Sequence, residues 1–121
     1  MANQALRKTK DFTPNGCPVT YCMNLIGGKW KPVIIHMLRR EVNRYGILLK
    51  AMPDISKQTL TNQLRELETD GIISRVVYAE IPPRVEYSIT DFGKTLLPVI
   101  DMMATWGIEQ LKASDQWGVK G

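Results

Sequence analysis

The chain of 121 residues is poor in the residues that hold metals, with one histidine, His36, and two cysteines, Cys17 and Cys22. A structural zinc site takes four such ligands, so none is expected. Long apolar runs are also missing, because a charged residue interrupts every candidate for a membrane-spanning helix. Segment 1–10 lacks the apolar core of a secretory signal. We therefore expect a cytoplasmic protein with no membrane partner and no structural disulfide.

Motifs for catalysis and cofactor binding are missing as well. The segment 27–29 is Gly-Gly-Lys, but it lacks the upstream glycine of a phosphate-binding loop, and Trp30 stands where Ser or Thr is required. His36 has no Ser, Asp or Cys at a spacing that would complete a catalytic set. An enzyme acting through Cys17 is an alternative, but no paired base supports it. We expect no enzyme activity and no cofactor.

The sequence does contain a basic excess of a kind that suits an anionic partner. The net charge is +4, and residues 1–53 hold nine Lys and Arg against two acidic residues, a net charge of +7. Residues 54–95 have a net charge of −2, and residues 96–121 of −1. A soluble surface is the alternative explanation. If the partner is DNA, phosphate attraction should come from Arg7, Lys8, Lys10, Lys29, Lys31, Arg39, Arg40, Arg44 and Lys50.

The segment 56–70 predicts a helix with two different faces. Ser56 is a favourable N-cap and Gly71 a favourable C-terminal stop. Three leucines recur on one face, and polar side chains that can bond to base edges or phosphate oxygens occupy the other. The alternative is an ordinary amphipathic surface helix. We expect Gln58, Thr61, Asn62 and Arg65 to enter a DNA groove, with Ser56 and Lys57 near phosphates.

The elements around this helix predict a mainly helical fold with a small β-hairpin. Helices are expected at 18–26, 30–40, 45–52 and 91–112, the last bent at Pro98 and Gly107. Strands are expected at 73–78 and 85–89, with Arg84 at the tip of the loop 79–84. Two short-linked helices followed by this hairpin are typical of a winged helix-turn-helix. The expected buried stripe of the second helix is Val33, Ile34, Met37 and Leu38.

The last helix is apolar on more than one side, which predicts a partner surface. A second copy of the chain is the simplest partner, so we expect a homodimer formed through helices at both ends of the domain. A small-molecule pocket between subunits, lined by its Met and Trp residues, is the alternative. The domain is expected at 17–112, with a flexible arm at 1–16 and a flexible tail at 113–121.

Five further motifs accompany the central helix segment LTNQLRELE of residues 60–68. They are Cys17-Pro18, LIGGKW at 25–30, Arg44-Tyr45, DGII at 70–73 and PPRVEYSIT at 82–90. Together they resemble the HxlR-type regulators, small winged-helix transcription factors related to the MarR group. The resemblance implies a homodimer on a pseudo-palindromic operator, with helix 56–70 in the major groove and the wing flanking it. Residues 46–48 depart from the family pattern, which usually has a Glu before the Leu.

Cys17 stands immediately before the first expected helix. Helix amides and the helix dipole stabilise a thiolate there and should lower the pKa of Cys17. The resemblance implies that Cys17 senses oxidants or electrophiles, by alkylation or by an intersubunit disulfide. A merely structural cysteine is the alternative, and Cys22 falls on the apolar stripe of the same helix. The leading hypothesis is thus a DNA-binding regulator with an unidentified effector, and its rival is a winged-helix module for protein assembly alone.

Overall fold

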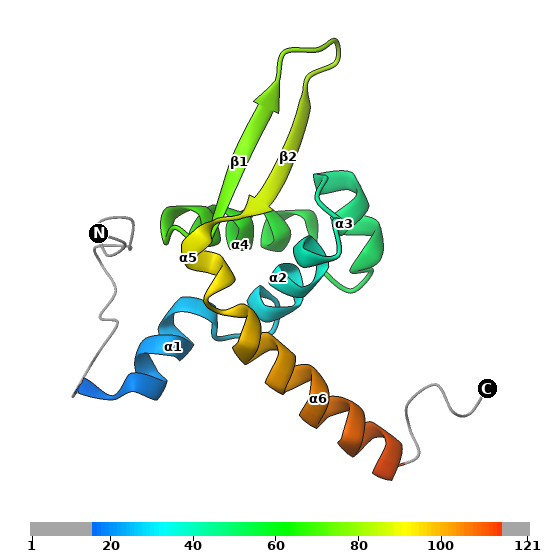
Figure 1. The fold of residues 1–121 in the computed structure, drawn as a ribbon. Coiled ribbons are helices and arrows are strands. Elements are labelled where there is room, and N and C mark those ends of the chain that lie inside the picture. Colours follow the sequence, from blue (N-terminus) through cyan, green and yellow to red (C-terminus); the bar gives the residue numbers. More distant parts are fainter. Residues whose placement is uncertain (1–15, 115–121) are drawn as a thin grey trace.

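The computed structural model describes residues 16–114, which form helices and one two-stranded antiparallel sheet (Figure 1). Residues 1–15 of the arm expected at 1–16, and residues 115–121 of the tail expected at 113–121, lie outside the described residues. None of the helices in the described range is long and apolar enough to cross a membrane. The elements are α1 (Pro18–Ile26), α2 (Lys31–Arg39), α3 (Tyr45–Ala51), α4 (Lys57–Thr69), β1 (Ile73–Tyr78), β2 (Arg84–Ile89), α5 (Asp91–Lys94) and α6 (Leu97–Ala113).

The central helix α4 has the caps and the buried face that its sequence predicts. The Ser56 hydroxyl accepts a hydrogen bond from the Thr59 amide at 3.0 Å, and Gly71 takes a φ of 78° just beyond the C-terminus. The three leucines of α4 are at most 2% exposed. They belong to one hydrophobic core with α1, α2, α3 and the start of β1, whose fully buried members are Leu25, Ile26, Ile34, Ile35, Leu48, Leu60, Leu64, Leu67, Ile72 and Ile73.

The buried stripe of α2 differs from the expected one by a rotation of the helix. Val33 is exposed, whereas Ile35 is fully buried, so the expectation for Val33 was wrong. The stripe follows Lys31, Ile34, Ile35 and Leu38, which are spaced at i, i+3, i+4 and i+7. The stem of Lys31 is buried because its ammonium group reaches a carboxylate on α4. The buried stripe was mispredicted because one of its four positions is occupied by a lysine, and the prediction considered only apolar residues.

The hairpin of β1 and β2 forms a wing that projects well beyond the helices (Figure 1). Its register pairs Ile73 with Ile89 at the base and Tyr78 with Arg84 at the far end. Strand β2 therefore begins at Arg84, and this residue is not at the loop tip as expected. The Arg84 guanidinium lies 4.0 Å from the centre of the Tyr78 ring, and this contact favours the extra pair.

The C-terminal segment forms two helices where one bent helix was expected. The chain turns at Thr95 and Leu96, between α5 and α6, and Pro98 lies in the first turn of α6. A proline is tolerated there because its missing N–H would have no partner in the helix. Gly107 lies within α6, which continues to Ala113, so Gly107 does not interrupt the helix.

The base of the wing is joined to α5 by close backbone packing. The Thr90 hydroxyl donates to the Gly71 carbonyl at 2.6 Å and accepts from the Gly93 amide at 2.9 Å. A Cβ atom added at Gly93 would lie 2.1 Å from the Ile72 carbonyl oxygen. Because that neighbour is backbone, only glycine fits at position 93.

We expect Gly93→Ala to lower the free energy of unfolding by about 1–3 kcal/mol, the usual cost of overpacking. The matched control is Gly46→Ala in α3, where an added Cβ meets nothing within 4 Å. This control should be neutral or gain up to about 1 kcal/mol, because alanine favours helix more than glycine does. Urea unfolding followed by circular dichroism measures both values, and equal stability of the two variants would contradict the prediction.

Candidate nucleic-acid interface

The outer face of α4 presents polar side chains to solvent. Ser56, Lys57, Gln58, Asn62 and Arg65 are all exposed. They lie opposite the buried leucines, and the helix is exposed along the side away from the core. Helices α3 and α4 are joined by residues 52–56, the short connection of a helix-turn-helix. The structure therefore brings the sequence-predicted groove residues onto one accessible surface.

Thr61 is half-buried and contacts Tyr45, a residue of the Arg44-Tyr45 motif for which no contact with this helix was expected. The Tyr45 hydroxyl donates to the Lys57 carbonyl oxygen at 3.1 Å and lies 3.1 Å from the Thr61 hydroxyl. These bonds attach the first turn of α3 to the first half of α4. The position of Tyr45 at the start of its expected helix gave no signal of this contact, which depends on how the two helices cross.

A second contact attaches α4 to α2. The Lys31 ammonium donates to the Glu66 carboxylate at 2.5 Å, with side chains 4% and 39% exposed. Burial of an unpaired ammonium would cost several kcal/mol, so Lys31 depends on this carboxylate. The pair also neutralises one negative charge on a helix that would otherwise repel phosphates. Lys31 was expected to lie on the basic surface, but it is buried and stabilises the position of α4 through this ion pair.

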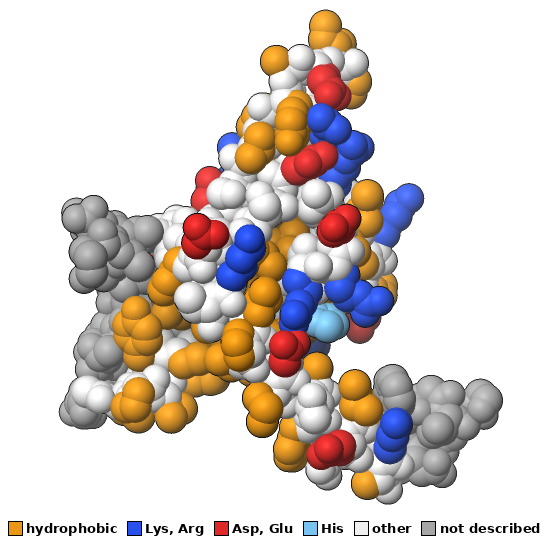
Figure 2. Space-filling model, viewed as in Figure 1, with side chains coloured by type: hydrophobic (Ala, Val, Ile, Leu, Met, Phe, Trp, Pro, Cys, Tyr) orange, Lys and Arg blue, Asp and Glu red, His pale blue; other side chains and the backbone are white. Residues whose placement is uncertain are grey.

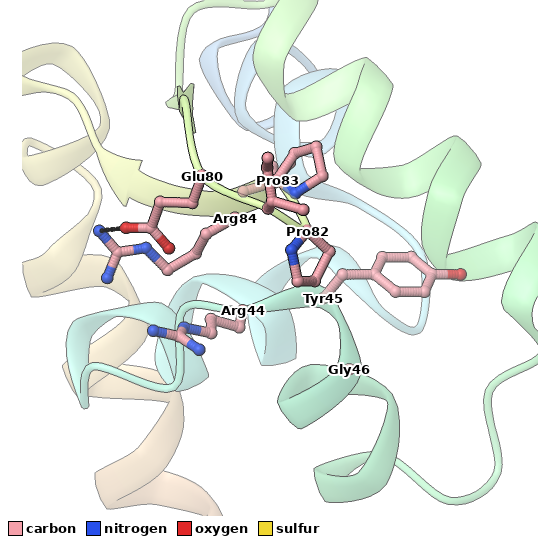
Figure 3. Close-up of a pocket in the computed structure, with 9 residues that line it drawn as sticks. Arg44, Tyr45, Gly46, Glu80, Pro82, Pro83 and Arg84 are labelled. Atoms are coloured by element: carbon pink, nitrogen blue, oxygen red, sulfur yellow. Dashed lines mark ion pairs between the residues drawn. The ribbon is translucent and has the colours of Figure 1, made fainter.

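The wing holds Arg84 in a network of charges. Its guanidinium lies 3.1 Å from Glu80 and 3.4 Å from Glu86, and Glu86 also lies 3.7 Å from Arg44. Arg44, Glu80 and Arg84 border a hollow of about 500 Å³ between the wing and the start of α3. Figure 3 shows Arg84 and Glu80 facing each other across its edge, with Pro82 and Pro83 beside them. Arg84 is therefore only 30% exposed and already paired.

Cys17 is the N-cap of α1, with Pro18 in the first turn of the helix as expected. The Thr20 hydroxyl, followed by the backbone amides of Thr20 and Val19, lowers the pKa of the Cys17 thiol. Desolvation has the smallest effect on this pKa and acts in the opposite direction. Both cysteines are free, and Cys22 packs against the core as expected. The described residues contain no group of three or more His, Cys, Asp or Glu that could hold a metal ion.

Large apolar side chains are exposed away from α4, on α1 and α6. Figure 2 shows hydrophobic side chains gathered along α6 and around α1. Met102 and Trp106 are 70% and 66% exposed, although both are large and apolar. A groove of about 600 Å³ lies between α2 and α6, and its lining from α6 includes Met103, Ile108 and Leu111. The exposed apolar residues of α1 and α6 are Val19, Met23, Val99, Met102, Met103, Trp106, Ile108 and Leu111.

The sequence matches a known family of helix-turn-helix proteins over most of its length. Residues 25–115 match the model of the HxlR-like helix-turn-helix family, which is most of the chain. The chain belongs to the HxlR-like helix-turn-helix family. The resemblance of its sequence motifs is thereby confirmed. The chain is similar to the HTH-type transcriptional regulator YybR of Bacillus subtilis (strain 168), at 43% identity over 104 residues, covering 84% of this chain and 83% of YybR.

Two solved structures are similar to this HxlR-like chain over most of their length. The redox regulator HypR in its oxidized form has a TM-score of 0.73 and 44% identity, covering 77% of this chain and 96% of HypR. A regulator of the MarR family from Porphyromonas gingivalis W83 has a TM-score of 0.71 and 41% identity, covering 85% and 98%. The predicted winged helix-turn-helix fold is confirmed. The chain is a helix-turn-helix transcriptional regulator, and these relatives are regulators rather than enzymes.

Proposed function

We propose that the protein is a homodimer that binds a pseudo-palindromic DNA operator in the cytoplasm. One α4 helix of each subunit enters a major groove, and the wing loop 79–84 lies on the flanking minor groove or backbone. The observation that carries this proposal is the exposed polar face of α4, held outward by the buried leucines behind it. An α-helix fits the B-DNA major groove, where each base pair presents a distinct pattern.

The residues of this face have the chemistry of direct readout. Gln58 and Asn62 can each bond to adenine with two hydrogen bonds, and Arg65 can bond to guanine in the same way. The amides at the start of α4, beside Ser56 and Lys57, favour a phosphate. Thr61 shares its hydroxyl with Tyr45, so a groove contact by Thr61 would use the remaining hydrogen-bonding capacity of that hydroxyl.

Arg84 would contact the backbone from the wing. Its present partners are carboxylates, so a phosphate would have to share or replace the ion pair with Glu80. Both partners are partly exposed, and pairs of this kind contribute little net stability, about 0–1 kcal/mol. The exchange is therefore energetically accessible, and Glu86 would keep the guanidinium oriented during it.

We expect Asn62→Ala and Lys57→Ala to weaken DNA binding in different ways. Loss of a base contact at Asn62 should reduce discrimination at one base pair by about 1–3 kcal/mol. Loss of a phosphate contact at Lys57 should weaken all sequences alike and reduce the slope of log affinity against log salt by about 0.9 per phosphate. Fluorescence anisotropy with a fragment flanking the protein's own gene and single-base variants of it measures both effects.

The same titration separates the proposal from its rival. A winged-helix module used only for protein assembly would show no steep salt dependence with any DNA. If Asn62→Ala leaves base discrimination unchanged while Lys57→Ala behaves as expected, α4 contacts DNA through a face other than the one proposed.

The apolar surface of α1 and α6 supports the homodimer. Helix α6 extends from the body of the subunit (Figure 1), and its exposed apolar side chains include Met103, Ile108 and Leu111, which line the groove beside α2. Two copies related by a two-fold axis would each cover the other's surface. A pseudo-palindromic operator requires the same symmetry of the protein. A small-molecule pocket in this groove remains the alternative to packing between the two subunits.

We expect light scattering to show a dimer at micromolar concentration and Trp106→Glu to dissociate it, because a carboxylate would have to be buried at the interface. The matched control is Thr69→Glu, which adds the same charge at an exposed position of α4, away from the apolar surface of α1 and α6. The control should remain a dimer. A monomeric wild type would remove the homodimer from the proposal.

We further propose that Cys17 makes DNA binding sensitive to oxidants or electrophiles. Its lowered pKa increases the thiolate fraction at neutral pH, and the thiolate is the reactive form. One of the similar solved structures is that of the redox regulator HypR, captured in its oxidized form. An electrophile would accept the thiolate lone pair and form a C–S bond. Alternatively, diamide would take two electrons and two protons from two Cys17 thiols, which join as an intersubunit disulfide.

Diamide or a quinone should abolish specific binding of the wild type and leave Cys17→Ser unaffected. Inactivation near pH 7 should be faster than that of a thiol without the hydrogen bonds to Thr20 and Val19, because these bonds lower the pKa of Cys17. Thr20→Val removes the main stabilising hydroxyl and should shift the pH dependence of inactivation upward. Anisotropy after timed treatment measures each rate, with Cys22→Ser as the matched control. Unchanged binding after treatment would refute thiol sensing and leave the regulator proposal intact.

A further inference from the structure

A small hollow separates the wing from α4. Its volume is about 380 Å³, and it is distinct from the hollow beside Arg44 and Pro82. One wall comes from α4, the opposite wall from β1 and β2, and the start of α3 closes one end. We call it the wing notch; its lining residues are Tyr45, Thr61, Leu64, Arg65, Glu68, Arg75 and Tyr87.

Two arginines face the wing notch from opposite walls. Arg65 lies on α4, and Arg75 lies on β1, where it pairs in register with Tyr87 of β2. Both are exposed, and in residues 16–114 neither lies within 4.0 Å of a carboxylate. The one acidic residue of the lining is Glu68, so the notch carries a net charge of +1.

This pattern contrasts with the other arginines of the interface side. Arg44 and Arg84 both pair with Glu86, and Arg84 also stacks on Tyr78. Those guanidinium groups are held by carboxylates of the protein, whereas that of Arg75 is available to an external anion. Arg75 was not among the residues expected to contact DNA, because the sequence places it within a strand without showing which wall it faces.

We propose that the wing notch holds a DNA backbone phosphate and that Arg75 is its contact from the wing. This inference rests on the proposed function. With α4 in a major groove and the wing on the adjacent minor groove, the sugar–phosphate strand that separates the two grooves passes between α4 and the wing. The notch lies at that crossing. Arg75 donates to the phosphate, and the positive charge of Arg65 adds to the attraction while its guanidinium reaches the base edge.

The test compares Arg75→Gln with wild type in anisotropy titrations over a range of KCl concentrations. The two probes are the fragment flanking the protein's own gene and a scrambled duplex of equal length. Arg75→Gln should weaken both duplexes by the same factor and reduce the salt slope by about 0.9 per phosphate, about 1.8 for a dimer. A phosphate contact carries no sequence information, so discrimination between the duplexes should not change.

Two variants keep the result interpretable. Arg75→Lys retains the charge and should retain the wild-type salt slope, which shows that strand packing is not the cause. Lys94→Gln removes a positive charge on α5, in a separate hollow beside Leu38 and Leu97, and should also leave the slope unchanged. An unchanged slope in Arg75→Gln overturns the inference. Absence of salt-dependent binding in the wild type overturns the proposed function instead.

Discussion

The burial of Leu60, Leu64 and Leu67 is the constraint on which the rest of the structure depends. Three leucines on one face of a helix fix its rotation about its own axis, because any other rotation would expose them to water. Gln58 and Asn62 point outward as a direct consequence. The core that receives the leucines is supplied by every element from α1 to β1, so the polar face is presented by the whole domain and not by the helix alone.

Two polar contacts fix the position of α4 along its own axis, which hydrophobic burial alone does not determine. Lys31 reaches Glu66 near one end of α4, and Tyr45 reaches Lys57 and Thr61 near the other. Apolar packing is non-directional, whereas hydrogen bonds and ion pairs require particular distances and angles. A DNA-reading helix needs this precision, since base contacts depend on placement within fractions of an ångström. The two contacts hold α4 to α2 near its C-terminal end and to α3 near its N-terminal end.

Local signals in the sequence were sufficient for most of the fold. The caps Ser56 and Thr90, the stop at Gly71 and the alternation before Ile89 act within a few residues, and the elements form where these signals predict. The errors arise where tertiary contacts decide. Lys31 in a core position moved the buried stripe of α2 away from Val33, and stacking on Tyr78 drew Arg84 into the strand. The wing notch was not predictable, because it depends on how the hairpin stands against α4.

The close approach at Gly93 has a mechanical consequence. Side chains absorb small displacements by changing rotamer, but at Gly93 the backbone of α5 meets the Ile72 carbonyl with no side chain between them. The Thr90 hydroxyl stabilises this contact, because it hydrogen-bonds both to Gly71, next to Ile72, and to Gly93 in α5. Close-packed atoms have low compressibility, so this contact between α5 and Ile72 transmits a displacement instead of absorbing it. A tilt of α5 and α6 would therefore rotate the base of the β1–β2 hairpin with it. The same rotation would displace the loop at the far end of the hairpin more than the base.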